Sequence, residues 1–281
     1  MSTPTQQARQ LLEQGQVTAV LGLRSGPEGP TPCLFTQPDE LDFLEDGPKY
    51  PLAKIAWRTL RAFPAGSSLA VVCRTCDSRA LQEQTRLGQY PEKRVISLVI
   101  PCDAEQAEAC SCSMPEVVKA DEAPSPLAAL SPKLRAMLEG PDRIMAWREA
   151  LQRCIKCYGC RNVCPVCLCP ECRLEDPAFV SATVLPPSPL PWHVCRATHV
   201  AESCVGCGAC QDACPSGIPL LALHTAIAGH LHEKTGYASG LNKPLPLSGS
   251  ATVTGPTGTA QPEWFTCTGQ CSGRPKTGED A

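Results

Sequence analysis

The sequence predicts an α+β / α/β fold, with a small N-terminal α/β domain followed by a helical and loop-rich domain organised by cysteines. Two observations predict this arrangement. Short apolar segments alternate with segments of helical spacing up to about residue 113, and two copies of a four-cysteine run ending in proline follow. Proline accounts for 29 of the 281 residues and gathers between these segments, which favours irregular connections there.

Three short apolar segments in the N-terminal part predict buried strands. They are residues 17–23, 69–73 and 94–100, and they are rich in Val, Ile and Leu. Between them, residues 51–63 and 77–87 place apolar side chains at helical spacing, and the proline at 51 suits a first helical turn. Strands that alternate with helices favour parallel pairing, so we expect an α/β domain over residues 10–113.

The remaining chain divides into three expected segments. Residues 114–133 are polar and rich in proline, which predicts a linker. Residues 134–240 contain both cysteine runs and are expected to form one domain, which begins with one or two helices up to residue 153. Residues 241–281 have few apolar side chains to bury, so we expect a mostly disordered tail.

The composition favours a cytoplasmic protein that binds metal through thiols. The chain has 20 cysteines, its first residues lack the apolar core of a signal peptide, and no window offers the roughly 20 apolar residues of a membrane span. In a reducing compartment so many thiols favour metal binding over disulfides. The net charge of −3 gives no indication of nucleic acid as a partner.

The most specific motif is C-x2-C-x2-C-x3-C-P, which occurs twice. This is the cysteine run of bacterial ferredoxins, and it predicts two 4Fe-4S clusters. The first three thiolates of such a run hold one cluster and the fourth holds the neighbouring cluster, so each copy supplies one ligand to the other. Zinc, which also binds four thiolates, is the alternative. The predicted metal ligands are Cys154, Cys157, Cys160, Cys164, Cys204, Cys207, Cys210 and Cys214.

Four further cysteines lie between or beside these runs. They could form a third site, for another cluster or for zinc, or they could be spare buried thiols that pack like small apolar side chains. These residues are Cys167, Cys169, Cys172 and Cys195.

Cysteines also follow two predicted strands of the N-terminal part. Cys73 and Cys76 stand where a strand gives way to a helix, Cys102 follows the next strand, and Cys110 and Cys112 come soon after. The carboxyl ends of parallel strands share one edge of a sheet, so Cys73, Cys76 and Cys102 are candidate cofactor-binding residues, for a cluster or beside a flavin. The alternative is that these thiols are coincidental, because their spacing matches no standard motif.

Four segments of the N-terminal half carry a family resemblance. They are residues 11–22 (LLEQGQVTAVLG), 37–41 (QPDEL), 68–81 (SLAVVCRTCDSRAL) and 100–102 (IPC). They resemble the beta-subunit family of coenzyme F-420 (deazaflavin) reducing hydrogenase and the related formate dehydrogenase. The chain looks like a short form of that family with a C-terminal two-cluster ferredoxin-type domain.

The resemblance has two departures and extends into the C-terminal half. Where the family has Pro-Cys-Asp after a strand, this chain has Thr75-Cys76-Asp77, and the later family cysteine matches Cys102, followed by Asp103-Ala104 instead of glycines. Residues 214–219 (CPSGIP) and a following helix to about residue 237 look like the ferredoxin extension of bacterial members. The resemblance covers roughly residues 11–245.

The resemblance implies FAD and iron-sulfur clusters, and electron transfer between a catalytic subunit and a deazaflavin, ferredoxin or heterodisulfide-reductase-like partner. Our hypothesis is therefore an iron-sulfur electron-transfer subunit of an anaerobic hydrogenase, formate dehydrogenase or heterodisulfide-reductase-like complex. Two alternatives stay open: an FAD-containing subunit that itself reduces a deazaflavin or ferredoxin-type acceptor, and a zinc-organised interaction module. The chain has no GxGxxG, phosphate-binding loop or triad-like grouping, so its sequence does not demonstrate catalysis.

Overall fold

The computed structural model describes residues 2–117, 125–176 and 189–241. Residues Met1–Leu245 form one compact unit, and a second unit, Pro246–Ala281, lies outside the described residues. The expected tail at 241–281 therefore lies outside the description except for its first residue, and so does the middle of the expected linker at 114–133.

A five-stranded sheet forms the N-terminal part, with strand order β2-β1-β4-β5 and β3 paired with β1. β1 runs parallel to β4 and β4 parallel to β5, whereas β2 and β3 are antiparallel to β1. Arg74 at the end of β4 pairs with Ile100 at the end of β5, so both strands finish at the same edge. The strands are β1 (Ala19–Arg24), β2 (Thr31–Phe35), β3 (Leu44–Glu45), β4 (Leu69–Arg74) and β5 (Val95–Ile100).

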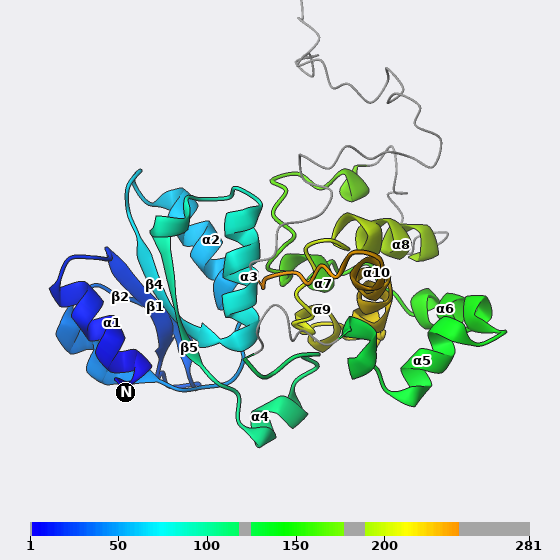
Figure 1. The fold of residues 1–281 in the computed structure, drawn as a ribbon, viewed down its shortest axis with the longest axis horizontal. Coiled ribbons are helices and arrows are strands. Elements are labelled where there is room, and N and C mark those ends of the chain that lie inside the picture. The colour runs from blue at the N-terminus through cyan, green and yellow to red at the C-terminus, as the bar shows by residue number, and fades with distance from the viewer. Residues whose placement is uncertain (1, 118–124, 177–188, 242–281) are drawn as a thin grey trace, which may run out of the picture. The chain divides into compact units, whose positions relative to one another are not determined.

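Helices cover both faces of this sheet (Figure 1). On one face Leu21 and Val71 pack with residues of α2 and α3, and on the other Val20 and Val72 pack with Ala8 of α1. The alternation of side chains along each strand thus builds two apolar layers. The helical elements here are α1 (Pro4–Glu13), η1 (Pro38–Phe43), α2 (Leu52–Ala62), α3 (Thr75–Arg86), η2 (Glu92–Arg94) and α4 (Ala104–Ala109).

The expected strands and helices of the N-terminal part are confirmed with shifts of one or two residues. β1, β4 and β5 correspond to the predicted segments 17–23, 69–73 and 94–100, and α2 and α3 correspond to 51–63 and 77–87. The mixed α/β class is confirmed as well. Helix α1 and the antiparallel strands β2 and β3 are additions that the sequence did not lead us to expect.

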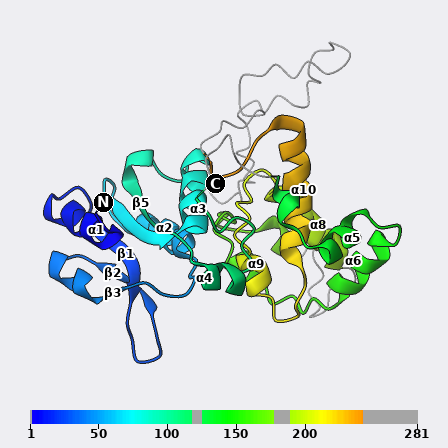
Figure 2. The same cartoon turned by 60° about the horizontal axis from the view of Figure 1, so that its bottom comes forward.

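The C-terminal part is helical and rich in loops (Figure 2). Its apolar core includes Trp147 and Leu151 of α6, together with Ile218, Leu220 and the cysteines Cys160 and Cys210. Residues 133–153 form two helices, α5 and α6, as expected. The elements are η3 (Pro126–Ala129), α5 (Pro132–Glu139), α6 (Arg143–Gln152), α7 (Gly159–Asn162), η4 (Arg173–Glu175), α8 (Pro189–His199), α9 (Ala209–Asp212) and α10 (Leu220–Thr235).

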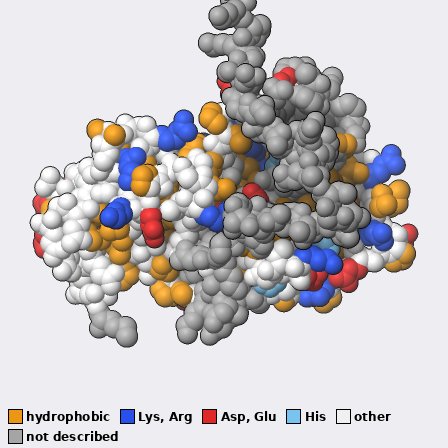
Figure 3. Space-filling model, turned by 45° about the horizontal axis from the view of Figure 1, so that its top comes forward, with side chains coloured by type: hydrophobic (Ala, Val, Ile, Leu, Met, Phe, Trp, Pro, Cys, Tyr) orange, Lys and Arg blue, Asp and Glu red, His pale blue; other side chains and the backbone are white. Residues whose placement is uncertain are grey.

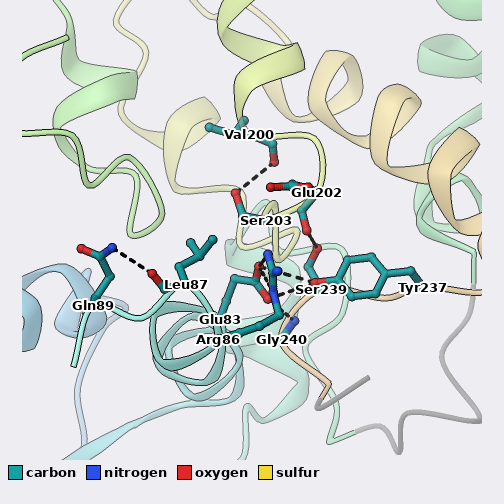
Figure 4. A network of polar contacts seen from close by, with 10 residues as sticks. All are labelled: Glu83, Arg86, Leu87, Gln89, Val200, Glu202, Ser203, Tyr237, Ser239 and Gly240. Atoms are coloured by element: carbon teal, nitrogen blue, oxygen red, sulfur yellow. Dashed lines mark hydrogen bonds and ion pairs between the residues drawn. The ribbon is translucent and has the colours of Figure 1, made fainter. Parts of the chain in front are cut away.

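Helix α3 bonds to both cysteine-rich segments. Gln84 donates to the carbonyl oxygen of Pro165 at 2.8 Å, and Arg79 donates to that of Val205 at 3.2 Å. The carboxylate of Glu83 accepts from the Gly240 N–H at 3.1 Å and the Tyr237 hydroxyl at 3.3 Å (Figure 4). The strand-and-helix part and the cysteine-rich part are therefore held together by buried polar contacts, and the domain boundary expected near residues 114–133 stays a prediction.

The surface carries both signs of charge. Figure 3 shows Lys and Arg side chains interspersed with Asp and Glu on the face that it presents, in line with the small net charge of −3. Within the described ranges, none of the helices combines the length and the apolar character that crossing a membrane requires.

Candidate metal centres

The two cysteine runs fold into the same turn. Lys156 and Tyr158 in the first run have positive φ angles of 55° and 57°, and Gly206 and Gly208 hold the equivalent positions with 64° and 74°. In both runs a four-residue helix, α7 or α9, follows at once. The repeated spacing in the sequence is therefore a repeated backbone path, which turns the first three thiols of each run to one side.

Backbone N–H groups point at the thiols from inside these turns. The Lys156 N–H lies 3.4 Å from Sγ of Cys154. In the second run the N–H of Gly206 donates to Cys204 and the N–H of Ala209 donates to Cys207, and each bond lowers the pKa of its thiol. Such donors stabilise a thiolate, which is the form that binds metal.

The first cavity has thiols of both runs in its wall. Cys154, Cys157 and Cys160 line it together with Cys214, the last cysteine of the second run. Tyr158, Trp192, His193 and Ile218 complete the mostly apolar wall, and the Tyr158 and Trp192 rings meet edge to face at 5.9 Å.

The second cavity also combines three cysteines of one run with the last cysteine of the other. Its cysteines are Cys204, Cys207 and Cys210, joined by Cys164 from the end of the first run. Arg196, His224 and several apolar side chains form the rest of the wall. The structure thus gathers the eight cysteines into the two crossed groups that the ferredoxin rule predicts.

Burial opposes ionisation of these thiols. It raises the pKa of Cys204 to about 11 and also raises the pKa values of Cys154, Cys160, Cys207 and Cys210. The pKa of Cys164 is instead lowered to about 6, chiefly because the Cys167 thiol donates to it. A metal that binds the five thiols with raised pKa values has to displace their protons, so metal uptake releases protons.

One buried cation lies between the two groups. Arg196 of α8 is 3% exposed and donates to the carbonyl oxygen of Cys160 at 2.9 Å, and its guanidinium lowers the pKa values of Cys160, Cys164 and Cys210. The same side chain reaches Sγ of Cys167 at 3.5 Å. Arg196 therefore offsets part of the negative charge that thiolates would bring to both cavities.

The donor sets fit iron-sulfur clusters. Each cavity offers four sulfur atoms and backbone N–H donors, and the first also has Nε2 of His193 in a buried position without a hydrogen-bond partner among the described residues. Within the described ranges, no three His, Cys, Asp or Glu side chains stand close enough together to hold a single metal ion. Sulfur atoms spread around a cavity suit a core of several irons and sulfides.

The other cysteines between the runs lie at different depths. Cys167 is half-buried beside Cys164, and its thiol donates to Cys164 and lowers the pKa of that thiol. Cys172 is half-buried, whereas Cys169 and Cys195 are exposed. A third site formed by Cys167, Cys169, Cys172 and Cys195 stays a prediction.

The N-terminal cysteines divide into two groups. Cys73 is buried in the apolar layer between the sheet and helices α2 and α3. Cys76, Cys102, Cys110 and Cys112 instead line a third and larger cavity, beyond the carboxyl ends of β4 and β5. The prediction that Cys73, Cys76 and Cys102 bind a cofactor is untested.

Four cationic residues near the thiols were not found from the sequence. They are Lys49, Lys54, Arg79 and Arg196, each of which contacts a cysteine-rich segment far away in the chain. Only the folded arrangement shows these contacts, because no local pattern distinguishes these cations from surface residues.

Comparison with known proteins gives two findings. Residues 197–219 match a family model described as a 4Fe-4S binding domain. The chain is 41% identical over 100 residues, 36% of its length, to the F420-dependent formate dehydrogenase subunit beta of Methanocaldococcus jannaschii. It is also 41% identical over 109 residues, 38% of its length, to the F420-dependent formate dehydrogenase 1 subunit beta of Methanococcus maripaludis.

These matches cover only part of the relatives. The chain spans 26% and 28% of the two formate dehydrogenase subunits, about a quarter of their length. The resemblance inferred from the sequence is nevertheless confirmed. The chain contains a 4Fe-4S binding domain, and over more than a third of its length it is a homologue of F420-dependent formate dehydrogenase beta subunits.

Proposed function

We propose that this protein is an iron-sulfur electron-transfer subunit of a cytoplasmic oxidoreductase complex of the formate dehydrogenase type, with two 4Fe-4S clusters. The observation that carries the proposal is the crossed arrangement of eight thiols around two cavities. Cys154, Cys157, Cys160 and Cys214 are the proposed ligands of one cluster. Those of the other are Cys164, Cys204, Cys207 and Cys210.

Bound clusters supply a carrier for single electrons. The chain's own residues set the conditions for this role. Thiolates hold the irons, N–H donors of the two turns withdraw charge from the sulfurs, and the buried Arg196 adds a positive charge close to both groups. Apolar side chains such as Ile218 and Leu220 keep water from much of the first cavity.

The cysteine group of the first cavity lies near the surface. Cys157 is exposed, and Ile155 beside it is an apolar side chain with 52% exposure. Electron exchange between proteins needs the carriers to approach closely, and the exposed Cys157 brings this group of thiols to the surface. We infer that the partner subunit docks over the Cys154–Cys160 turn.

The partner is a catalytic subunit of an oxidoreductase. The names of the two relatives support formate dehydrogenase, although the shared segment is about a quarter of their length. Hydrogenase-like and heterodisulfide-reductase-like assemblies belong to the same proposal as alternatives. FAD, which the family resemblance implies, is tested by the flavin content of the purified protein.

Iron and sulfide counts test the proposal. The full chain, purified without oxygen, should contain about eight irons and eight sulfides for the two ferredoxin-type clusters, and more if a further site is filled. Replacing Cys157 and Cys207 together with serine should reduce the iron content and change the low-temperature paramagnetic spectrum of the reduced protein. Cys33→Ser, in strand β2 away from both cavities, is the matched control. Zinc without acid-labile sulfide, or a spectrum unchanged by the double substitution, contradicts the proposal.

A further inference from the structure

A third group of cysteines gathers at the edge of the N-terminal sheet. Cys76 lies in the first turn of α3, Cys102 follows β5, and Cys110 and Cys112 follow α4. The Cys112 thiol is hydrogen-bonded to the thiols of Cys110 and Cys76. Cys102 lines the same cavity as Cys76, Cys110 and Cys112. Four thiols from three separate segments therefore meet at one place.

The topology explains why they meet. β4 and β5 are parallel neighbours, so Cys76 and Cys102, which follow them, come to the same edge of the sheet. Helix α4 begins at Ala104 with Asp103 as its cap and ends at Ala109, and it returns the chain toward that edge. Cys110 and Cys112 therefore line the same cavity as Cys76 and Cys102.

Basic side chains bond directly to these sulfurs. Nζ of Lys49 lies 3.3 Å from Sγ of Cys110, and the guanidinium of Arg79 lies 3.6 Å from Sγ of Cys112. Arg74 lines the same cavity as Cys102 and donates to the carbonyl oxygen of the preceding Pro101 at 3.2 Å. Arg79 is only 3% exposed, and its other bonds go to the carbonyl oxygens of Met114 and Val205. Lys49 and Arg74 also form ion pairs with Asp212 and Asp46, whereas the bonds described for Arg79 go to carbonyl oxygens and to the Cys112 sulfur. A thiolate at Cys112 would therefore balance the buried charge of Arg79.

The cysteines line one cavity that borders the second ferredoxin-type run. Ala209, Asp212 and Ala213 of that run also line it. The segment that carries Cys112 is joined to the run by a hydrogen bond from the Ser113 N–H to the Gly206 carbonyl oxygen, at 2.9 Å. Lys49 joins the same elements, since it bonds to Cys110, to the carbonyl oxygen of Cys207 and to Asp212.

We propose that Cys76, Cys102, Cys110 and Cys112 bind a further 4Fe-4S cluster, beside the cysteine group of residues 204–210. Four sulfurs around one cavity suit a core of several irons and sulfides, and the iron count distinguishes such a core from a single zinc ion. The site is additional to the eight thiols on which the proposed function rests and is independent of them.

Thiol labelling of the unaltered full chain tests the site without any substitution. In the anaerobically purified protein, Cys102, Cys110 and Cys112 should resist alkylation and should react once a chelator and an oxidant have removed the iron. Cys33, which is half-buried like these three, serves as the internal comparison because iron removal should not change its reactivity. Alkylation of Cys110 and Cys112 at the same rate before and after iron removal overturns the proposal.

An iron count then identifies what these four cysteines bind. Cys102→Ser with Cys112→Ser should lower the iron content by about four per chain and keep the spectrum of the other clusters, whereas Cys33→Ser should change neither. The Cys157→Ser and Cys207→Ser pair should leave about four irons at this site, so a failure of the two-cluster proposal is distinguishable from a failure of this one. An unchanged iron count in the Cys102 and Cys112 variant, or loss of zinc or flavin instead of iron, overturns the proposal.

Discussion

The guanidinium of Arg196 lies 2.7 Å from Nε2 of His224, in the buried space between the two groups of ferredoxin-type cysteines. Arginine can only donate, so Nε2 of His224 accepts and the ring is neutral. Burial and the nearby Arg196 charge lower the pKa of His224 to about 3. His193, which faces the same arginine, has a pKa lowered to about 4. These three residues form one buried unit whose charge resides on the arginine.

We expect Arg196→Gln to weaken cluster retention. The substitution removes a buried charge and leaves the carbonyl oxygen of Cys160 without its donor, which should destabilise the fold by roughly 3 kcal/mol. It also withdraws a positive charge from both cysteine groups, so the reduction potentials of the clusters should fall. Potentiometric titration followed by paramagnetic resonance measures this fall. Arg148→Gln, at an exposed position of α6, is the control and should leave both quantities unchanged.

Acid should destabilise the protein through His224. Its pKa is about 3 in the folded chain and near 6.5 when unfolded, so the unfolded state binds more protons between these values. The contribution of neutral His224 to the free energy of unfolding is complete above pH 6.5 and is lost as the pH falls toward 3. At pH 5.5 the loss is roughly 1.4 kcal/mol. His224→Gln should therefore lose less stability than the unaltered protein between pH 7.5 and 5.5 in thermal melts.

The exposed His230 provides the control for this pH effect. His230→Gln should follow the unaltered protein at each pH, because His230 lies on the solvent side of α10. Equal acid sensitivity of the His224 variant and the unaltered protein would show that His224 does not stay neutral in the fold.

Gly208 should not tolerate a side chain. Its φ is 74°, and a Cβ atom there would collide with the backbone of Ser111, which crosses over it. The left-handed conformation costs an alanine about 1–2 kcal/mol and the collision adds roughly as much again. Gly208→Ala should therefore lower the thermal midpoint and detach the segment of Cys110 and Cys112. Gly66→Ala, with a φ of 94° and open space around it, isolates the conformational effect alone.

The Glu83 carboxylate should be a major link between the two parts of the chain. It is 1% exposed at its side chain and accepts from Arg86, Tyr237 and Gly240. Glu83→Ala leaves these donors unpaired and should destabilise the fold by roughly 3–5 kcal/mol, whereas Tyr237→Phe should cost about 1 kcal/mol. Faster hydrogen exchange at residues 237–240 is the expected readout. Glu92→Ala, at an exposed acidic position, should change neither exchange nor stability.

The parts predicted from the sequence are those with local signals. Apolar alternation and helical spacing identified β1, β4, β5, α2 and α3, and the cysteine spacing identified eight candidate ligands. Helix α1 was not predicted because its sequence is mostly polar. Only Ala8 in it is fully buried, so its stability depends on packing against the sheet. Strand β2 was not predicted because it contains Pro32. Proline is unusual in a strand, and it is accommodated here at the sheet edge.

The contacts that join distant segments had no such signal. Cys110 and Cys112 were noted only as neighbours of Cys102, because C-x-C alone matches no standard cluster motif. Their meeting with Cys76 depends on the strand order and on the turn after α4. The same is true of Arg196, whose partners at residues 160, 167 and 224 lie on other elements.

The two turns around the ferredoxin-type cysteines are unequal in one respect. The first uses Lys156 and Tyr158 for its left-handed positions, whereas the second uses glycines under the crossing Ser111–Ser113 segment. The first turn thus has room for side chains at these positions, and that of Tyr158 packs against Trp192 in the wall of the first cavity. The second turn has no room for side chains, because the Ser111–Ser113 segment lies over its glycines. The two copies of the motif can therefore diverge differently: the first toward other molecules, and the second toward the N-terminal sheet.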